Sequence, residues 1–200
     1  MPADPGARVT SRPDVPARVL VIGYGNALRT DDGVGWHAAR LLAGDPRLAD
    51  VVVVAEHQLT PELAFDLSLA SLVILLDATT ETPAGTVTVR SIAEPGAAAG
   101  GGAGSGAGPG AGSRGPGEAV GIPPGASSHH VDPELLLALA RQLYGRAPEA
   151  VVVSVGVSEM GLGEGLSPAV EAALPAVADI VARLVAEHDE LAGEEARRPA

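Results

Sequence analysis

The segment that most constrains the fold of this chain runs from residue 19 to residue 43 and reads VLVIGYGNALRTDDGVGWHAARLLA. The apolar run within residues 18–23 predicts a buried strand. Glycines follow, which let the chain turn sharply, and then two adjacent acids, Asp31 and Asp32. Apolar residues at helical spacing predict a helix over 33–43. Ligands bind outside the carboxyl ends of the strands in an open α/β sheet, so both acids are expected at a ligand-binding edge.

Strands and helices are expected to alternate along the rest of the chain. Apolar runs predict strands at 51–55, 72–76 and 150–155. Apolar periodicity predicts helices at 60–68, 133–143 and 168–187. Asp132 before Pro133 and Ser167 before Pro168 are the expected caps of the last two, the first of these should end near Gly145, and Pro175 should kink the second. Residues 86–89 alternate polar and apolar side chains and follow the third strand too closely for a helical crossover, which predicts an antiparallel strand. This order predicts a three-layer α/β fold: a mostly parallel, twisted sheet of about five strands with helices on both faces.

The chain is expected to form a single domain over residues 18–187. Residues 1–17 lack apolar periodicity and predict a disordered leader. Residues 95–126 consist almost wholly of Gly, Ala, Pro and Ser, so they predict a flexible insertion within the domain. Residues 188–200 are charged and predict a frayed tail.

Composition excludes several classes of function. The chain has no cysteine, which rules out thiol catalysis, disulfides and thiolate metal sites. Its formal net charge of −12 argues against a nucleic-acid partner, since binding to phosphates requires positive charge. No segment has the length and apolarity of a membrane span, and the first residues do not resemble a secretory signal. We therefore expect a cytoplasmic protein that does not bind a membrane. We also expect it to be a monomer.

Three residues far apart in the sequence are candidates for a metal site. Asp32 follows the first strand, Asp77 directly follows the third, and His129 precedes a predicted helix. Carboxylate and imidazole ligands together suit nickel or zinc better than magnesium or calcium. His130 competes with His129 as the ligand, and His57, at the end of the second strand, could be a further ligand or a substrate contact.

Structural roles for the same residues are the competing interpretation. Asp31 and Asp32 can satisfy amide donors at the start of the following helix. Asp77 can cap the turn after its strand, and His129 can lie in a surface loop. The spacing of the residues does not decide between these interpretations.

Two other classes of site fit the sequence less well. Gly23 and Gly25 begin a dinucleotide-binding fingerprint, but Leu28 stands where its third glycine belongs. Asp31 and Asp32 would also meet the pyrophosphate with like charge. A serine hydrolase of the nucleophile-elbow type is disfavoured because no GxSxG motif lies at a predicted strand-to-helix turn.

Four motifs of the chain resemble those of the nickel–iron hydrogenase maturation proteases. They occur in the family's order between residues 18 and 187, outside the insertion. These motifs are Gly23-x-Gly25-Asn26-x-Leu28-x-x-Asp31-Asp32-Gly33-x-Gly35, Leu76-Asp77-Ala78, Ser127-Ser128-His129, and Val155-Gly156-Val157 followed by Gly165-Leu166-Ser167-Pro168.

The resemblance implies an α/β endopeptidase of the cytoplasm. Members of the family remove a short C-terminal extension from the hydrogenase large-subunit precursor after nickel has been inserted. The family's metal-binding positions correspond to Asp32, Asp77 and His129, with nickel supplied by the substrate, and the Ser-x-His pattern favours His129 over His130. Either Asp31 or Asp77 could act as the general base.

Two features depart from the commoner family pattern. The family often has glutamate where this chain has Asp32, which is shorter by one methylene. Residues 56–61 replace an Asp-Gly-rich turn and could mark a subgroup with a different hydrogenase partner. A non-catalytic chaperone that binds the immature large subunit is the alternative function.

Overall fold

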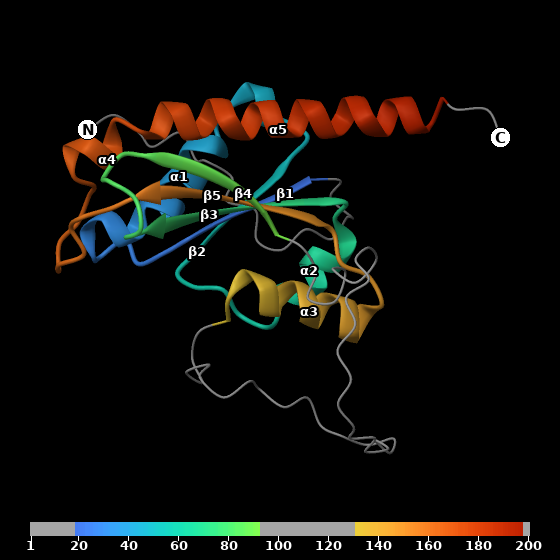
Figure 1. The fold of residues 1–200 in the computed structure, drawn as a ribbon, viewed down its shortest axis with the longest axis horizontal. Coiled ribbons are helices and arrows are strands. Elements are labelled where there is room, and N and C mark those ends of the chain that lie inside the picture. The colour runs from blue at the N-terminus through green and yellow to red at the C-terminus, as the bar shows by residue number, and fades with distance from the viewer. Residues whose placement is uncertain (1–18, 93–130, 198–200) are drawn as a thin grey trace, which may run out of the picture.

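The computed structural model describes residues 19–92 and 131–197, which build a five-stranded sheet between two layers of helices (Figure 1). The strand order is β2-β1-β3-β5-β4. All neighbouring strands are parallel except β4, which pairs antiparallel with β5. This arrangement confirms the predicted fold class. The strands are β1 (Val19–Tyr24), β2 (Val52–Glu56), β3 (Leu72–Thr79), β4 (Val87–Ile92) and β5 (Glu149–Gly156).

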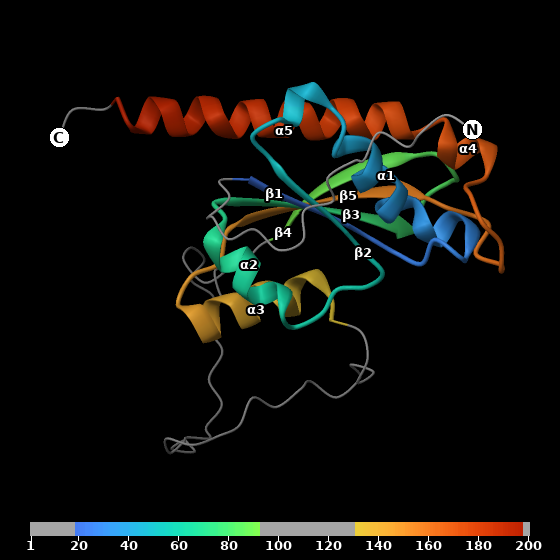
Figure 2. The same ribbon diagram turned by 180° about the vertical axis from the view of Figure 1, so that it is seen from behind.

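Helices cover both faces of the sheet, as Figures 1 and 2 show from opposite sides. One face carries α1 (Val34–Leu42) and α5 (Leu174–Glu195), and the other carries α2 (Leu63–Leu69) and α3 (Pro133–Tyr144). Three short elements complete the described chain: the 3₁₀ turns η1 (Thr30–Gly33) and η2 (Pro46–Leu48), and the single-turn helix α4 (Pro168–Glu171).

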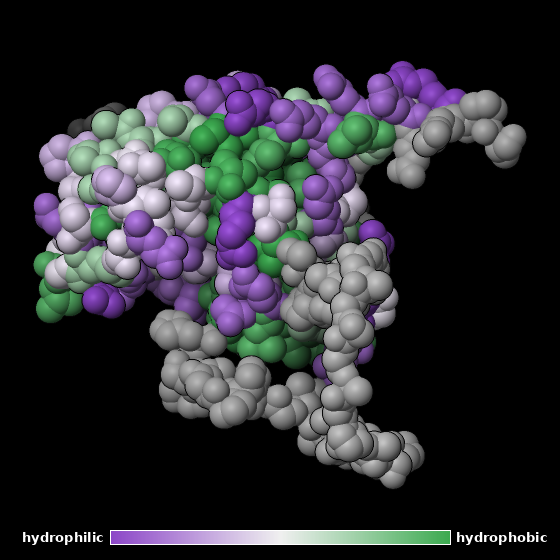
Figure 3. Space-filling model, in the orientation of Figure 1, coloured by the Kyte–Doolittle hydropathy of each residue, from purple (hydrophilic) through white to green (hydrophobic). Residues whose placement is uncertain are grey.

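Alternation along the strands divides the apolar core into two halves. In β1, Val19 and Val21 pack toward α1 and α5, whereas Leu20 and Ile22 pack toward α2 and α3. The apolar runs in the sequence are continuous because both faces of a parallel sheet are buried. Figure 3 shows polar side chains on the outer face of α5 and apolar ones beneath it, over the sheet.

The ends of α3 follow the rules that predicted them. The Asp132 carboxylate accepts a hydrogen bond from the Leu135 amide at 2.7 Å, which is N-capping geometry. Gly145 ends the helix in the left-handed conformation, with φ of 76°.

The last predicted helix, 168–187, is two helices, so the predicted kink at Pro175 is wrong. The chain breaks between α4 and α5, which places Pro175 in the first turn of α5, where its missing amide would have no intrahelical acceptor. α5 also continues to Glu195, beyond the predicted end at residue 187.

Several sequence-based expectations fall on residues that the structure leaves undescribed. The leader, the insertion, His129 and His130 all lie outside the described residues. Within residues 19–92 and 131–197, none of the helices combines the length and apolarity needed to cross a membrane.

Candidate functional site

A cavity of about 610 Å³ opens at the carboxyl ends of β1, β2 and β3, where the parallel strands end together. Predicted site residues from three separate segments meet here: Asp32, His57 and Asp77. The cavity is lined by Tyr24, Gly25, Asn26, Arg29, Asp32, His57, Gln58, Leu59, Asp77 and Val131.

Asp77 is a carboxylate of the cavity whose pKa departs from its ordinary value. Burial at the end of β3 raises its pKa above the ordinary value, and the nearby Asp32 carboxylate raises it further. Hydrogen bonds from the Tyr24 hydroxyl and the Ala78 amide, the latter at 2.8 Å, favour the ionised form and offset part of this shift. A carboxylate with a raised pKa in a cavity is a typical site of function.

Tyr24 is a site residue that the sequence analysis did not identify. It ends β1, and its hydroxyl donates a hydrogen bond to Asp77. Burial raises the pKa of Tyr24 far above the usual tyrosine value, and the Asp77 charge acts in the same direction, so the phenol remains a donor. The signal in the sequence was an aromatic residue at a strand end in a chain with only 2% aromatic residues.

The Tyr24→Phe variant is expected to lower the free energy of unfolding by about 1.5 kcal/mol or more at neutral pH, since a hydrogen bond to a charged group is lost. The loss should shrink in acid, where Asp77 is protonated. Urea unfolding at neutral pH and in acid measures this loss of stability. Tyr144→Phe is the matched control, because Tyr144 lies at the exposed end of α3. Equal losses for the two variants would contradict the assignment of this bond.

The two adjacent acids of the first motif point to different places. Asp32 lines the cavity, but Asp31 is 0% exposed and lies outside it. The Asp31 carboxylate accepts hydrogen bonds from the Ser167 amide at 2.7 Å, the Ser167 hydroxyl at 2.9 Å and the Glu159 amide at 3.3 Å. This placement favours an anchoring role for Asp31 over the general-base role. Ser167 was predicted to cap the following helix, but its side chain makes no capping bond and binds Asp31 instead.

Glycines of the first motif let the backbone segments of the site approach one another closely. A Cβ on Gly25 would lie 2.0 Å from the Asp32 carbonyl oxygen, and Gly25 has a φ of +136°. A Cβ on Gly35 would lie 2.2 Å from the Leu76 carbonyl oxygen. Both positions therefore require glycine, which accounts for their place in the motif.

The predicted metal trio is partly placed by the structure. Asp32 and Asp77 line one cavity, whereas His129 and its competitor His130 are not described. His57 lines the same cavity with an exposed side chain. Among the residues that the structure describes, no three or more His, Cys, Asp or Glu side chains are grouped closely enough to hold a metal ion.

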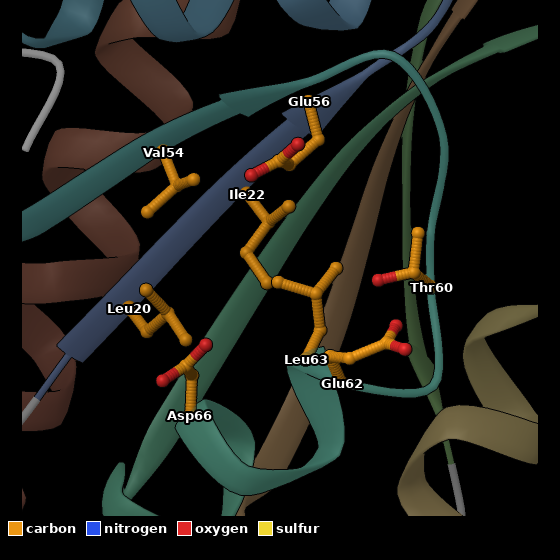
Figure 4. Close-up of a pocket in the computed structure, with 8 residues that line it drawn as sticks. All are labelled: Leu20, Ile22, Val54, Glu56, Thr60, Glu62, Leu63 and Asp66. Carbon is orange, nitrogen blue, oxygen red and sulfur yellow. The ribbon is translucent and has the colours of Figure 1, made fainter. Parts of the chain in front are cut away.

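A second, smaller cavity of about 170 Å³ lies below β1 and β2, against α2 (Figure 4). Leu20, Ile22 and Val54 form its apolar wall, and carboxylates from β2 and α2 lie around it (Figure 4). Its lining contains none of the predicted site residues. The larger cavity at the strand ends is therefore the candidate site.

Comparison with solved structures identifies this architecture. The [NiFe] hydrogenase maturation protease HycI from Thermococcus kodakarensis is 17% identical, with a TM-score of 0.57 and coverage of 84% of this chain and 91% of that one. The hydrogenase 2 maturation peptidase of a Thaumarchaeota archaeon is 24% identical, with a TM-score of 0.56 and coverage of 84% and 98%. The Escherichia coli hydrogenase maturating endopeptidase HybD is 21% identical, with a TM-score of 0.59 and coverage of 85% and 93%.

No protein-family model and no curated protein sequence matches the chain. The structural likeness extends over most of the chain and over nearly all of each compared protein. It agrees with the resemblance that the four sequence motifs carry. The chain has the fold of the [NiFe] hydrogenase maturation proteases.

Proposed function

We propose that this protein is an endopeptidase that removes the C-terminal extension of a [NiFe]-hydrogenase large-subunit precursor after nickel insertion. The observation that carries the proposal is that Asp32 and Asp77, from two separate motifs, line one cavity at the strand ends. The fold shared with hydrogenase maturation proteases supports it.

In this proposal, the nickel ion belongs to the substrate. Asp32, Asp77 and His129 engage it, which brings the scissile peptide bond to the cavity. Carboxylate and imidazole donors fit a borderline divalent ion such as nickel. Val131, two residues after His129, lines the same cavity as the two aspartates, which supports including His129 in the set.

Asp77 is our candidate for the general base. Its carboxylate lines the cavity beside Asp32, and an ionised carboxylate there can accept a proton during the reaction. Nickel polarises the scissile carbonyl or lowers the pKa of a water molecule when it is bound. In either case we propose that Asp77 takes up the proton of the attacking water; its hydrogen bonds with Tyr24 and the Ala78 amide support this role.

We further propose that the protein works in the cytoplasm as a monomer, with the precursor as its partner and without nucleic acid or membrane. The net charge of −12 supports the absence of nucleic acid. A requirement for bound nickel would make cofactor loading the condition for cleavage.

The intact mass of a nickel-loaded large-subunit precursor, measured before and after incubation with this protein, tests the function. We expect loss of one defined C-terminal peptide. A precursor without nickel should remain at least tenfold more resistant, because the ion that the site recognises is missing. His129→Ala should abolish cleavage and His130→Ala should leave it largely intact.

Each other outcome has a distinct meaning. An unchanged mass with stable complex formation would favour the non-catalytic chaperone. An unchanged mass without binding would refute the proposed substrate. Equal cleavage of nickel-free and nickel-loaded precursor would refute recognition through the metal.

A further inference from the structure

The turn that carries Asp32, η1 (Thr30–Gly33), is hydrogen-bonded to the loop that follows β5, residues 157–167. The Thr30 amide donates to the Gly163 carbonyl at 3.0 Å, and the Gly163 amide donates back to the Leu28 carbonyl at 3.0 Å. The Thr30 hydroxyl donates to the Glu159 carbonyl at 2.7 Å. The two segments therefore form a small parallel bridge at the edge of the site.

The Asp31 carboxylate is the central contact of this junction. It is fully buried and takes three donors from the 157–167 loop: the Ser167 amide, the Ser167 hydroxyl and the Glu159 amide. The Asp31 amide donates to the Glu159 carbonyl at 3.0 Å, so side chain and backbone bind the same loop. Hydrogen bonds to a buried charge are strong and directional, which fixes the position of the turn.

The turn is strained directly before the two acids. Thr30 has a φ of 45°, the left-handed region, and among the described residues it is the sole non-glycine with positive φ. A β-branched residue is rarely found there, because its Cβ crowds the backbone. Such a conformation persists only where the surroundings hold it. The surroundings here are the hydrogen bonds that join Thr30 and Asp31 to the 157–167 loop.

On its other side the turn packs against Gly25, the residue directly after β1. A Cβ on Gly25 would lie only 2.0 Å from the Asp32 carbonyl oxygen, so the turn can approach this closely because residue 25 is glycine. The Asp32 amide donates to the Arg29 carbonyl at 3.1 Å. The backbone of Asp32 is thus held between Gly25 and the junction with the 157–167 loop, while its side chain lines the cavity.

We propose that Asp31 is a positioning residue: together with Ser167 it holds the strained turn that directs the Asp32 carboxylate into the cavity. The effect of this positioning on catalysis rests on the proposed function. It gives the two adjacent acids separate roles, because Asp32 faces the substrate and Asp31 faces the protein. Asp31 does not take up a proton during the reaction.

Ser167→Ala is the first test, because it removes one donor to Asp31 without removing a helix cap. We expect kcat for precursor cleavage to fall about tenfold, since small misplacement of a reacting group is costly in rate, and KM to change little. Ser68→Ala is the matched control. It removes a buried serine hydroxyl whose 2.6 Å hydrogen bond to the Phe65 carbonyl lies within α2, outside the cavity lining.

The Asp31→Asn and Asp31→Ala variants separate positioning from proton transfer. Asparagine keeps an acceptor for the Ser167 amide, and the Ser167 hydroxyl can turn to accept from the new NH₂ group. We therefore expect Asp31→Asn to recover much of the activity that Asp31→Ala loses. Loss of a general base would be larger than about 100-fold in both variants, because neither side chain takes up a proton.

Hydrogen exchange of residues 29–32 gives a readout that is independent of activity. In Ser167→Ala these amides should exchange about tenfold faster than in the wild type, and in Ser68→Ala at the wild-type rate. Unchanged exchange in Ser167→Ala, or equal kcat losses for Ser167→Ala and Ser68→Ala, would overturn the assignment. If the wild type itself leaves the precursor intact, the proposed function fails, and the exchange rates still decide whether Asp31 and Ser167 hold the turn.

Discussion

Replacement of Asp77 by asparagine is expected to abolish cleavage of the nickel-loaded precursor and, at the same time, to raise the melting temperature of the protein. Asparagine has nearly the same shape and keeps an acceptor for the Ala78 amide, but it can neither take up a proton nor carry the charge that binds a cation. We expect a loss of cleavage rate greater than about 100-fold. Intact mass of the precursor and thermal unfolding, measured on the same samples, give both results.

The gain in stability follows from the raised pKa of Asp77. In the unfolded chain this carboxyl has a pKa of about 3.9, and in the folded protein burial raises that pKa. As the pH rises between these values the unfolded chain releases its proton first, so the folded state loses stability; the loss is complete above the folded pKa. The advantage of Asp77→Asn should therefore be full at neutral pH and vanish below about pH 3.9.

Asp179→Asn is the control for this experiment. Asp179 is an exposed aspartate of α5 whose carboxylate pairs with Arg47 at the surface. Its replacement should leave cleavage unchanged and alter stability by less than about 1 kcal/mol. An active Asp77→Asn variant would refute both the general-base and the ligand role of Asp77. An inactive variant that is also less stable would show that the charge of Asp77 supports the fold.

The layout of the fold could be predicted from the sequence because its signals are local. Continuous apolar runs indicate strands buried on both faces, and Asp132 with Pro133 indicates a helix start, as the structure confirms. Asp77 was predicted at the site for the same reason: it directly follows an apolar run, and the end of a parallel strand is the ligand-binding edge.

The separate roles of Asp31 and Asp32 could not be predicted, because the deciding contacts are far apart in sequence. Asp31 is buried by donors from Ser167, 136 positions later, and from Glu159, 128 positions later. The serine itself gave a misleading local signal, since Ser-Pro before an apolar helix is typical of a cap. Tertiary hydrogen bonds determine which of two adjacent acids faces the cavity, and no pattern in a single sequence contains them.

Gly35→Ala is expected to be strongly destabilising, although it adds only one methyl group to the first motif. A Cβ at this position would lie 2.2 Å from the Leu76 carbonyl oxygen and 2.4 Å from the Tyr24 carbonyl oxygen. Both contacts are with backbone, so neither can be relieved by a side-chain rotation. The start of α1 would have to move away from β1 and β3, which we expect to lower the free energy of unfolding by about 3 kcal/mol, at the upper end of typical overpacking effects.

The cleavage rate should fall by more than the loss of stability explains, because Leu76 directly precedes Asp77 and Tyr24 lines the cavity. The Leu76 carbonyl directly precedes Asp77, and a shift there moves the carboxylate relative to Asp32. At a temperature where Gly35→Ala remains folded by circular dichroism, kcat should still fall at least about tenfold, since a displacement of about 1 Å is costly in rate. Urea unfolding and precursor cleavage at that temperature measure the two effects separately.

Gly44→Ala is the matched control, since it adds the same methyl group just after the same helix. Its Cβ would meet the Leu41 carbonyl oxygen at 3.7 Å, which is ordinary van der Waals contact. That variant should be as stable as the wild type within about 0.5 kcal/mol and fully active. If Gly35→Ala behaved in the same way, the close approach of α1 to the ends of β1 and β3 would not be what positions Asp77. If Gly35→Ala lost stability but kept its kcat, the packing of α1 would not determine the geometry of the site.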